Sequence, residues 1–239
     1  MTVELAPRRR VRSFVRRERP LKAGAIAAYD RLWPRFGLSE ATWADLGRDQ
    51  EVVLDIGFGD GEALLTMAKA DPRRHYVGVE MYRTGIVKVM RALEEQSVSN
   101  VGLIEGDAQA VVAGIADARI DMVLIFYPDP WPKARHHKRR LVRSPFLAEV
   151  ARILRPGGLL HFATDWAPYA EEVASLVGQH PDFRENSEGR GDRPVTRFER
   201  RGQKLGHDAR DLRFQRRSVE QTYGVETGLV SAVPPVLKT

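Results

Sequence analysis

The sequence VVLDIGFGDG, residues 52–61, decides the fold of this chain. Its first five residues are apolar except for Asp55 and predict a buried strand, and the next five predict a glycine-rich turn. Helical periodicity follows over residues 62–70. A strand, a glycine turn and a helix in succession are typical of an α/β sheet, which binds ligands at the carboxyl ends of its strands. We therefore expect a ligand at this turn.

The same alternation continues along the chain and predicts a mostly parallel sheet with helices on both faces. Further strands are expected at residues 75–79, 101–105, 121–126 and 159–163. Helices are expected at residues 24–46, 83–96, 144–154 and 168–178. Residues 182–186 and 212–216 are expected to form an antiparallel pair at the sheet edge. The predicted organisation is a basic arm (residues 1–22), one domain (23–224) and a flexible tail (225–239).

Length and charge limit the classes of function. A chain of 239 residues with 43% hydrophobic content can bury one substantial core. The net charge of +6 favours an anionic partner, nucleic acid before a membrane surface. The absence of cysteine excludes disulfides and fits a reducing compartment. Without an apolar run of spanning length or a signal-like segment, the expected location is the cytoplasm, with no membrane partner.

The glycine turn does not match the common phosphate-binding motifs. Glu62 stands where a dinucleotide fingerprint needs glycine, and the Walker lysine is absent. Acidic residues instead end three successive strands: Asp55, Glu80 and Asp107. A carboxylate at the second strand end can bind both ribose hydroxyls, and one at the third can accept from an adenine amino group. Each acid alone fits a solvated strand end, but three beside one turn favour a nucleoside site.

The segment FYPDPWPKARHHKRR, residues 126–140, places one carboxylate beside aromatic rings and a cationic tract. Two prolines hold Asp129 on a stiff, non-helical turn. A flat heterocycle could lie on Tyr127 or Trp131 while the basic residues bind phosphates. This arrangement suggests a nucleobase pocket beside a nucleic-acid backbone ridge. The alternatives are a helix cap for Asp129 and a metal site at the two histidines, which the absence of cysteine and of helical histidine spacing disfavours.

Residues 50–165 resemble class I S-adenosylmethionine-dependent methyltransferases. The resemblance implies a Rossmann-like fold with a seven-stranded, mostly parallel sheet. It also implies S-adenosyl-L-methionine as cofactor. In this chain Gly57 and Gly59, with Asp55, would cradle the methionine part. Glu80 would then hold the ribose, and Asp107 would meet the adenine.

Three motifs together resemble the tRNA (guanine-N7-)-methyltransferase family: residues 126–140, TDWAPY at 164–169 and TRFE at 196–199. RSFVR at residues 12–16 is similar to that family's N-terminal region. The resemblance implies an enzyme that methylates N7 of the guanine at position 46 in the tRNA variable loop, with tRNA as partner and no obligatory protein partner. The first-strand acid, often glutamate in the family, is Asp55 here, and the residues after Val225 match nothing in it.

The resemblance also implies roles for individual residues. Asp129 is the catalytic candidate and would border the methionine end of the cofactor. The expected substrate-binding residues are Lys133, Asp165, Thr196, Arg197, Phe198 and Glu199. The expected RNA-contacting residues are Arg135, His136, His137, Lys138, Arg139 and Arg140, and no metal is expected.

Other functions stay open for this sequence. Residues 197–217 also fit an ordinary solvated surface, because acids intersperse their arginines. The rival functions are a methyltransferase for another RNA and a non-enzymatic RNA-binding module that keeps the fold. A methyltransferase for a protein or small molecule is a further rival, but it leaves the basic segments unexplained. A nicotinamide-dependent oxidoreductase is a fourth rival, which Glu62 disfavours.

Overall fold

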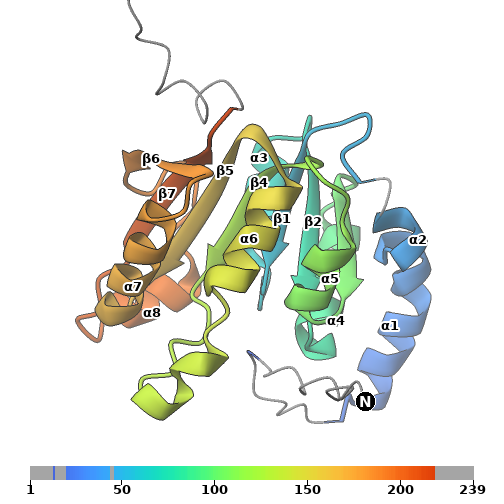
Figure 1. Ribbon diagram of the computed structural model, residues 1–239. Helices are drawn as coiled ribbons and strands as arrows, with labels where there is room; N and C mark the ends of the chain where they lie inside the picture. The colour runs from blue at the N-terminus through green and yellow to red at the C-terminus, as the bar shows by residue number, and fades with distance from the viewer. Residues whose placement is uncertain (1–12, 14–19, 44–45, 219–239) are drawn as a thin grey trace, which may run out of the picture.

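The computed structural model describes residue 13, residues 20–43 and residues 46–218. Most of the expected basic arm and all of the expected tail at residues 225–239 lie outside these residues. The described residues form one α/β unit, shown in Figure 1. No helix within them is long and apolar enough to cross a membrane.

The described residues contain a seven-stranded sheet with the order β3-β2-β1-β4-β5-β7-β6. Its strands are β1 (Val52–Ile56), β2 (His75–Glu80), β3 (Val101–Glu105), β4 (Ile120–Phe126), β5 (Leu154–Thr164), β6 (Phe183–Glu188) and β7 (Arg210–Arg216). The first five strands pair in parallel, whereas β7 pairs antiparallel with both β5 and β6. The expected fold class and the antiparallel edge pair are both confirmed.

The order of the strands reverses at β1. The chain runs outward from β1 to β2 and β3, then returns to add β4 on the other side of β1. Every residue of β1 is buried, because helices cover both of its faces. Crossover helices diverge at this point, which leaves room for a ligand beyond the carboxyl ends of β1 and β4.

Helices cover both faces of the sheet through two hydrophobic clusters. One cluster includes side chains of α5 (Ala108–Gly114), α6 (Ser144–Ile153) and α7 (Ala167–Gly178), which lie toward the viewer in Figure 1. The other includes side chains of α1 (Ala23–Phe36), α3 (Glu62–Ala70) and α4 (Arg83–Glu95). Three shorter helices are α2 (Glu40–Trp43), the 3-10 helix η1 (Ala134–Arg139) and α8 (Arg197–Gln203).

Several elements differ from their predicted bounds. The long helix expected at residues 24–46 ends at Phe36, since Gly37 leaves the helix to bridge Leu103. The strand β5 begins at Leu154 rather than at residue 159, and its pairing with β4 shifts register between Ile120 and Met122. The short helices α5, η1 and α8 were not predicted, because six or seven residues give too few turns for a periodic pattern.

Candidate active site at the carboxyl ends of β1 and β4

A cavity of about 650 Å³ opens at the switch point of the sheet. Its residues come from three places: the first strand and its turn, the end of β4, and the segment around α8. They are Asp55, residues 57–63, Phe126, Tyr127, Arg193, Thr196, Arg197, Phe198 and Arg201. The glycine turn predicted as a cofactor cradle therefore faces the TRFE segment predicted as substrate-binding.

The glycine turn has a backbone that only glycine adopts easily. Gly57, Gly59 and Gly61 have φ values of 76°, 56° and 73°. A Cβ at Gly57 would project into open space rather than into protein, whereas one at Gly61 would lie 2.1 Å from Cγ2 of Val89. The turn thus has open space for a ligand beside Gly57, whereas it packs tightly against α4 at Gly61.

Asp55 is a buried carboxylate that lacks a partner on one oxygen. Its side chain is 2% exposed, and Oδ2 has no hydrogen-bond partner among the described residues. Burial and the nearby Glu80 carboxylate raise the pKa of Asp55 to about 7. A buried, unsatisfied acceptor is costly unless a ligand completes it. The amino group of a bound methionine moiety is a suitable partner.

Glu80 and Asp107 lie at their predicted strand ends and are engaged with the backbone. Glu80 accepts from the N–H groups of Gly59 (2.9 Å), Met81 (2.7 Å) and Tyr82 (3.1 Å). Asp107 caps α5 through the Gln109 N–H at 2.9 Å. Neither acid is among the residues that line the cavity. Glu80 instead ties the glycine turn to the end of β2.

The loop after β4 has an unusual backbone. Tyr127 and Trp131 have φ values of 52° and 45°, which are uncommon for residues with a side chain. The Tyr127 N–H donates to the Ala163 carbonyl at 2.7 Å and fixes the start of the loop. Asp129 lies two residues further on, is exposed and is not among the residues that line the cavity. Surrounding protein atoms raise its pKa, and the Arg139 guanidinium opposes that shift.

Of the two rings predicted to hold a heterocycle, Tyr127 lines the cavity and Trp131 does not. The Tyr127 ring lies 4.9 Å from the Phe198 ring, centroid to centroid, and Phe198 is 58% exposed. Trp131 is covered by the Arg139 guanidinium, 3.8 Å from its ring centroid, and its indole N–H donates to the Ser13 carbonyl at 3.2 Å. An aromatic pair that lines a cavity, with the Phe198 ring exposed, suits stacking with a planar base.

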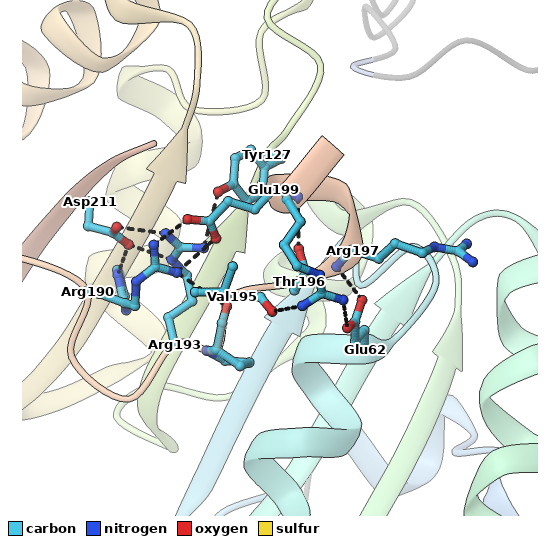
Figure 2. Close-up of polar contacts among 12 residues, drawn as sticks. Glu62, Tyr127, Arg190, Arg193, Val195, Thr196, Arg197, Glu199 and Asp211 are labelled. Carbon is cyan, nitrogen blue, oxygen red and sulfur yellow. Dashed lines mark hydrogen bonds and ion pairs between the residues drawn. The ribbon is translucent and has the colours of Figure 1, made fainter. Parts of the chain in front are cut away.

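The helix α8 lies opposite the glycine turn and is linked to it by charge. Thr196 caps α8 through the Glu199 N–H. The Arg197 N–H donates to Glu62 at 2.6 Å, and the Arg200 guanidinium reaches the same carboxylate at 3.0 Å (Figure 2). Glu62, which argued against a dinucleotide site in the sequence, thus joins the two sides of the cavity.

An ion-pair network centred on Arg193 lies next to Tyr127, as Figure 2 shows. Arg193 pairs with Asp211 at 2.6 Å and with Glu199 at 2.7 Å, and Arg190 also pairs with Glu199. Although burial raises the pKa of Glu199, the hydrogen bonds from both arginines lower it to about 2. Glu199 is 3% exposed, so its position does not suit a direct contact with a base or ribose. Arg193 and Asp211 were missed in the sequence, where no local pattern marks them.

The predicted RNA-contacting residues divide by exposure. Arg135 and Lys138 are exposed, as is Lys133 before them, while His136, His137 and Arg139 are half-buried. Desolvation and the surrounding cations lower the pKa of His136.

Arg140 occupies a different position, because it is only 2% exposed. Its guanidinium pairs with Glu172, donates to the Pro130 carbonyl at 2.9 Å and lies over the Tyr169 ring. This position does not suit a phosphate contact. Arg140 instead anchors the loop that carries Asp129 to α7.

Asp165, expected to bind substrate, lies beyond the end of β5 and is half-buried. Its Oδ2 lies 3.2 Å from Nδ1 of His207, in the segment after α8. Asp165 is not among the residues that line the cavity. No local sequence pattern indicates this Asp165–His207 pair.

Solved structures share this fold. The aminoglycoside resistance methyltransferase NpmB1 matches with a TM-score of 0.51 at 18% identity, over 75% of this chain and 94% of its own. The 30S ribosomal A1408 methyltransferase from an uncultured bacterium matches with a TM-score of 0.52 at 12% identity, over the same shares. This likeness shows that the chain has the Rossmann-like α/β fold of these proteins.

Comparison with related sequences identifies the family of this chain. A family model described as putative methyltransferase matches residues 49–212. A tRNA (guanine-N(7)-)-methyltransferase of Nitrosococcus oceani is 43% identical over 87% of this chain and 92% of its own length. One from Xanthomonas oryzae pv. oryzae is 45% identical over 90% of each. The chain belongs to the tRNA (guanine-N(7)-)-methyltransferase family.

Proposed function

We propose that this enzyme transfers a methyl group from S-adenosyl-L-methionine to N7 of the guanine at position 46 in the variable loop of tRNA. One observation carries the proposal. A single cavity joins a buried carboxylate with one unpartnered oxygen, Asp55, and a left-handed glycine turn to an aromatic pair, half-buried Tyr127 and exposed Phe198. The first half suits an amino-bearing nucleoside cofactor and the second suits a planar base. tRNA is used in the cytoplasm, and we place the enzyme there.

The residues of the turn fit this cofactor. Asp55 would accept from the methionine amino group, and the open space at Gly57 and Gly59 would admit the ligand close to the backbone. Glu80 holds the turn through the Gly59 N–H, and its Oε2 would accept a further hydrogen bond from a ribose hydroxyl. Asp107 at the end of the third strand would meet the adenine. When bound, the cofactor supplies an electrophilic methyl group on a cationic sulfur.

The chemistry requires positioning more than proton transfer. Guanine N7 has a lone pair and no proton, so direct in-line attack on the methyl group needs no general base. The base becomes cationic as the bond forms, and a nearby carboxylate gains attraction that it lacks in the ground state. We assign this role to Asp129. It would also orient the base through the guanine N1 and N2 donors, while Tyr127 and Phe198 stack on it.

The tRNA backbone would lie along the basic segment. Lys133, Arg135 and Lys138 are exposed cations next to the loop of Asp129 and suit phosphate contacts. His136, His137 and Arg139 complete this surface. The target guanine must leave its stack to reach the cavity, as is common for enzymes that modify bases.

The proposed specificity is tested with labelled methyl donor and an unmodified tRNA transcript. We expect about one methyl group per tRNA, located at N7 of guanine 46, and no transfer to a transcript with adenine there. Strand cleavage at N7-methylguanine, read by primer extension, locates the label. Methylation of another atom or nucleotide would overturn the assignment.

The role of Asp129 has its own test. Asp129→Ala should reduce the single-turnover rate by a factor of about 100 or more, because an electrostatic contact of the transition state is lost. Binding of S-adenosylhomocysteine, measured by calorimetry, should fall much less. Wild-type turnover in this variant would remove Asp129 from the mechanism.

A further inference from the structure

Arg193 is the largest fully buried side chain among the described residues. It lines the floor of the cavity and belongs to none of the motifs that identify the cofactor turn or the substrate segments. A buried guanidinium is expensive to desolvate, and replacing such an ion pair by apolar residues is often neutral or stabilising. Stability alone is therefore a weak reason for this residue.

The partners of Arg193 come from three different elements, as Figure 2 shows. It donates to Asp211 of β7 through Nε at 2.6 Å and Nη2 at 2.7 Å. Its Nη1 donates to Glu199 of α8 at 2.7 Å and to the Tyr127 hydroxyl, after β4, at 3.2 Å. One planar group with fixed donor directions thus holds β7, α8 and the loop after β4 in place relative to one another.

Tyr127 needs such support. Its backbone is in the left-handed region at φ 52°, which an L-residue adopts only when its surroundings hold it there. The Ala163 carbonyl fixes its N–H, and Arg193 fixes its hydroxyl and lies 5.4 Å from its ring centroid. Phe198, the other ring of the aromatic pair, is one residue before Glu199 on α8. Arg193 therefore contacts the hydroxyl of Tyr127 and, through Glu199, the helix that carries Phe198.

We propose that Arg193 is a positioning residue for methyl transfer. It holds Tyr127 and the Phe198–Glu199 segment at a fixed distance from each other, so that the target base is aligned with the methyl donor. The inference rests on the proposed function and adds a residue whose guanidinium donates to the protein groups Asp211, Tyr127 and Glu199. A misplacement on the order of 1 Å at a reacting centre can cost about 100-fold in rate. The effect of Arg193 should therefore appear in the rate rather than in cofactor affinity.

The test is a double-mutant cycle on the full-length enzyme. Arg193→Lys keeps the charge and removes the planar fork, while Tyr127→Phe removes only the hydroxyl. Single-turnover methylation of unmodified tRNA should slow about 100-fold in the first variant and about tenfold in the second. S-adenosylhomocysteine affinity should change less than about threefold in either. If Arg193 acts through Tyr127, the double variant is no slower than Arg193→Lys alone.

Arg155→Lys is the matched control. Arg155 pairs with Asp121 at 2.7 Å near the amino ends of β4 and β5, and it does not line the cavity. This substitution should lower the melting temperature and leave the single-turnover rate unchanged. If Arg193→Lys does not fold, the rate of Tyr127→Phe alone tests the inference. This variant should fold, because phenylalanine keeps the packed aromatic ring.

Two results would overturn the inference. One is a wild-type rate in a folded Arg193→Lys or in Tyr127→Phe, and the other is a double variant slowed by the product of the two single effects. Failure of the proposed function looks different. In that case the wild-type enzyme itself leaves guanine N7 unmethylated, whatever the variants do.

Discussion

At the scale of single residues, Asp55 carries the cofactor assignment. An ionised carboxylate buried beside Glu80 is unfavourable, so the ligand-free protein tends to keep a proton on Asp55 near neutral pH. A cationic ligand reverses this preference, because its positive charge favours the ionised form. Cofactor binding and the protonation of Asp55 should therefore be linked.

The linkage predicts the pH dependence of binding. The affinity for S-adenosylmethionine should rise as pH increases from about 6 to about 8, by at most about tenfold per pH unit for one released proton. Asp55→Asn should bind more weakly and lose this dependence. Calorimetry at several pH values measures both, and equal pH profiles for the two proteins would disprove the contact.

The raised pKa of Asp55 also affects how the free energy of unfolding depends on pH. The pKa of Asp55 is raised in the folded state, so between about pH 4 and 7 the folded protein holds a proton that the unfolded chain has released. This contribution to the free energy of unfolding is present at low pH. It is lost as pH rises through that window, by at most about 1.4 kcal/mol per pH unit.

Asp55→Asn should therefore be more stable than the wild type at pH 8, with the difference shrinking toward pH 5. Urea unfolding of both proteins without ligand measures the difference. A gain that grows as pH falls would have the wrong sign.

At the scale of elements, the glycine turn combines a backbone requirement with room for a ligand. Gly57→Ala should cost about 1 kcal/mol of stability, because alanine is strained at φ 76°. Its methyl group would also enter the cavity, so affinity for S-adenosylhomocysteine should fall at least about tenfold. Thermal unfolding and calorimetry separate the two effects.

Gly157→Ala is the control for the turn, since Gly157 has φ 82° near the amino end of β5 and does not line the cavity. It should lose similar stability and keep its cofactor affinity. Equal affinity losses in the two variants would show that strain alone explains Gly57→Ala.

The basic segment around η1 is tested through salt dependence. Changing Arg135 and Lys138 to alanine should weaken tRNA binding and reduce the slope of log affinity against log salt by about 1.4 to 1.8, since each phosphate contact contributes about 0.7 to 0.9. Changing Lys69 and Arg73, which lie at the end of α3 and before the amino end of β2, removes the same charge and should leave the slope unchanged. A slope that falls equally in both would show that net charge, not this segment, binds the tRNA.

What could be predicted from the sequence depends on how local the signal is. The strand, turn and helix at residues 52–70 were predicted with their bounds, because apolar runs and glycines encode them locally. The helix α8 and Arg193 were missed, because a seven-residue helix has little periodicity and a buried arginine looks like a surface one until its partners are known. Tyr127 lies 66 residues from Arg193 in the sequence and Asp211 lies 18 residues from it, and both meet Arg193 only in the fold.

At the scale of the whole molecule, the strand order brings the site together. The return of the chain across β1 to β4 places the glycine turn beside the loop of Tyr127. The segment between β6 and β7 then brings α8 and its ion pairs to the same cavity. Exposed ion pairs such as those at Glu62 contribute little stability singly. Their main effect here is to keep α8 opposite the turn.

We propose that the cavity at the ends of β1 and β4 receives the methyl donor next to the target base. A crystal structure with S-adenosylhomocysteine shows directly where the donor binds. We expect the ligand between Asp55, Gly57 and the loop of Tyr127, with its amino group on the Asp55 carboxylate. A ligand bound elsewhere, with this cavity empty, would contradict it.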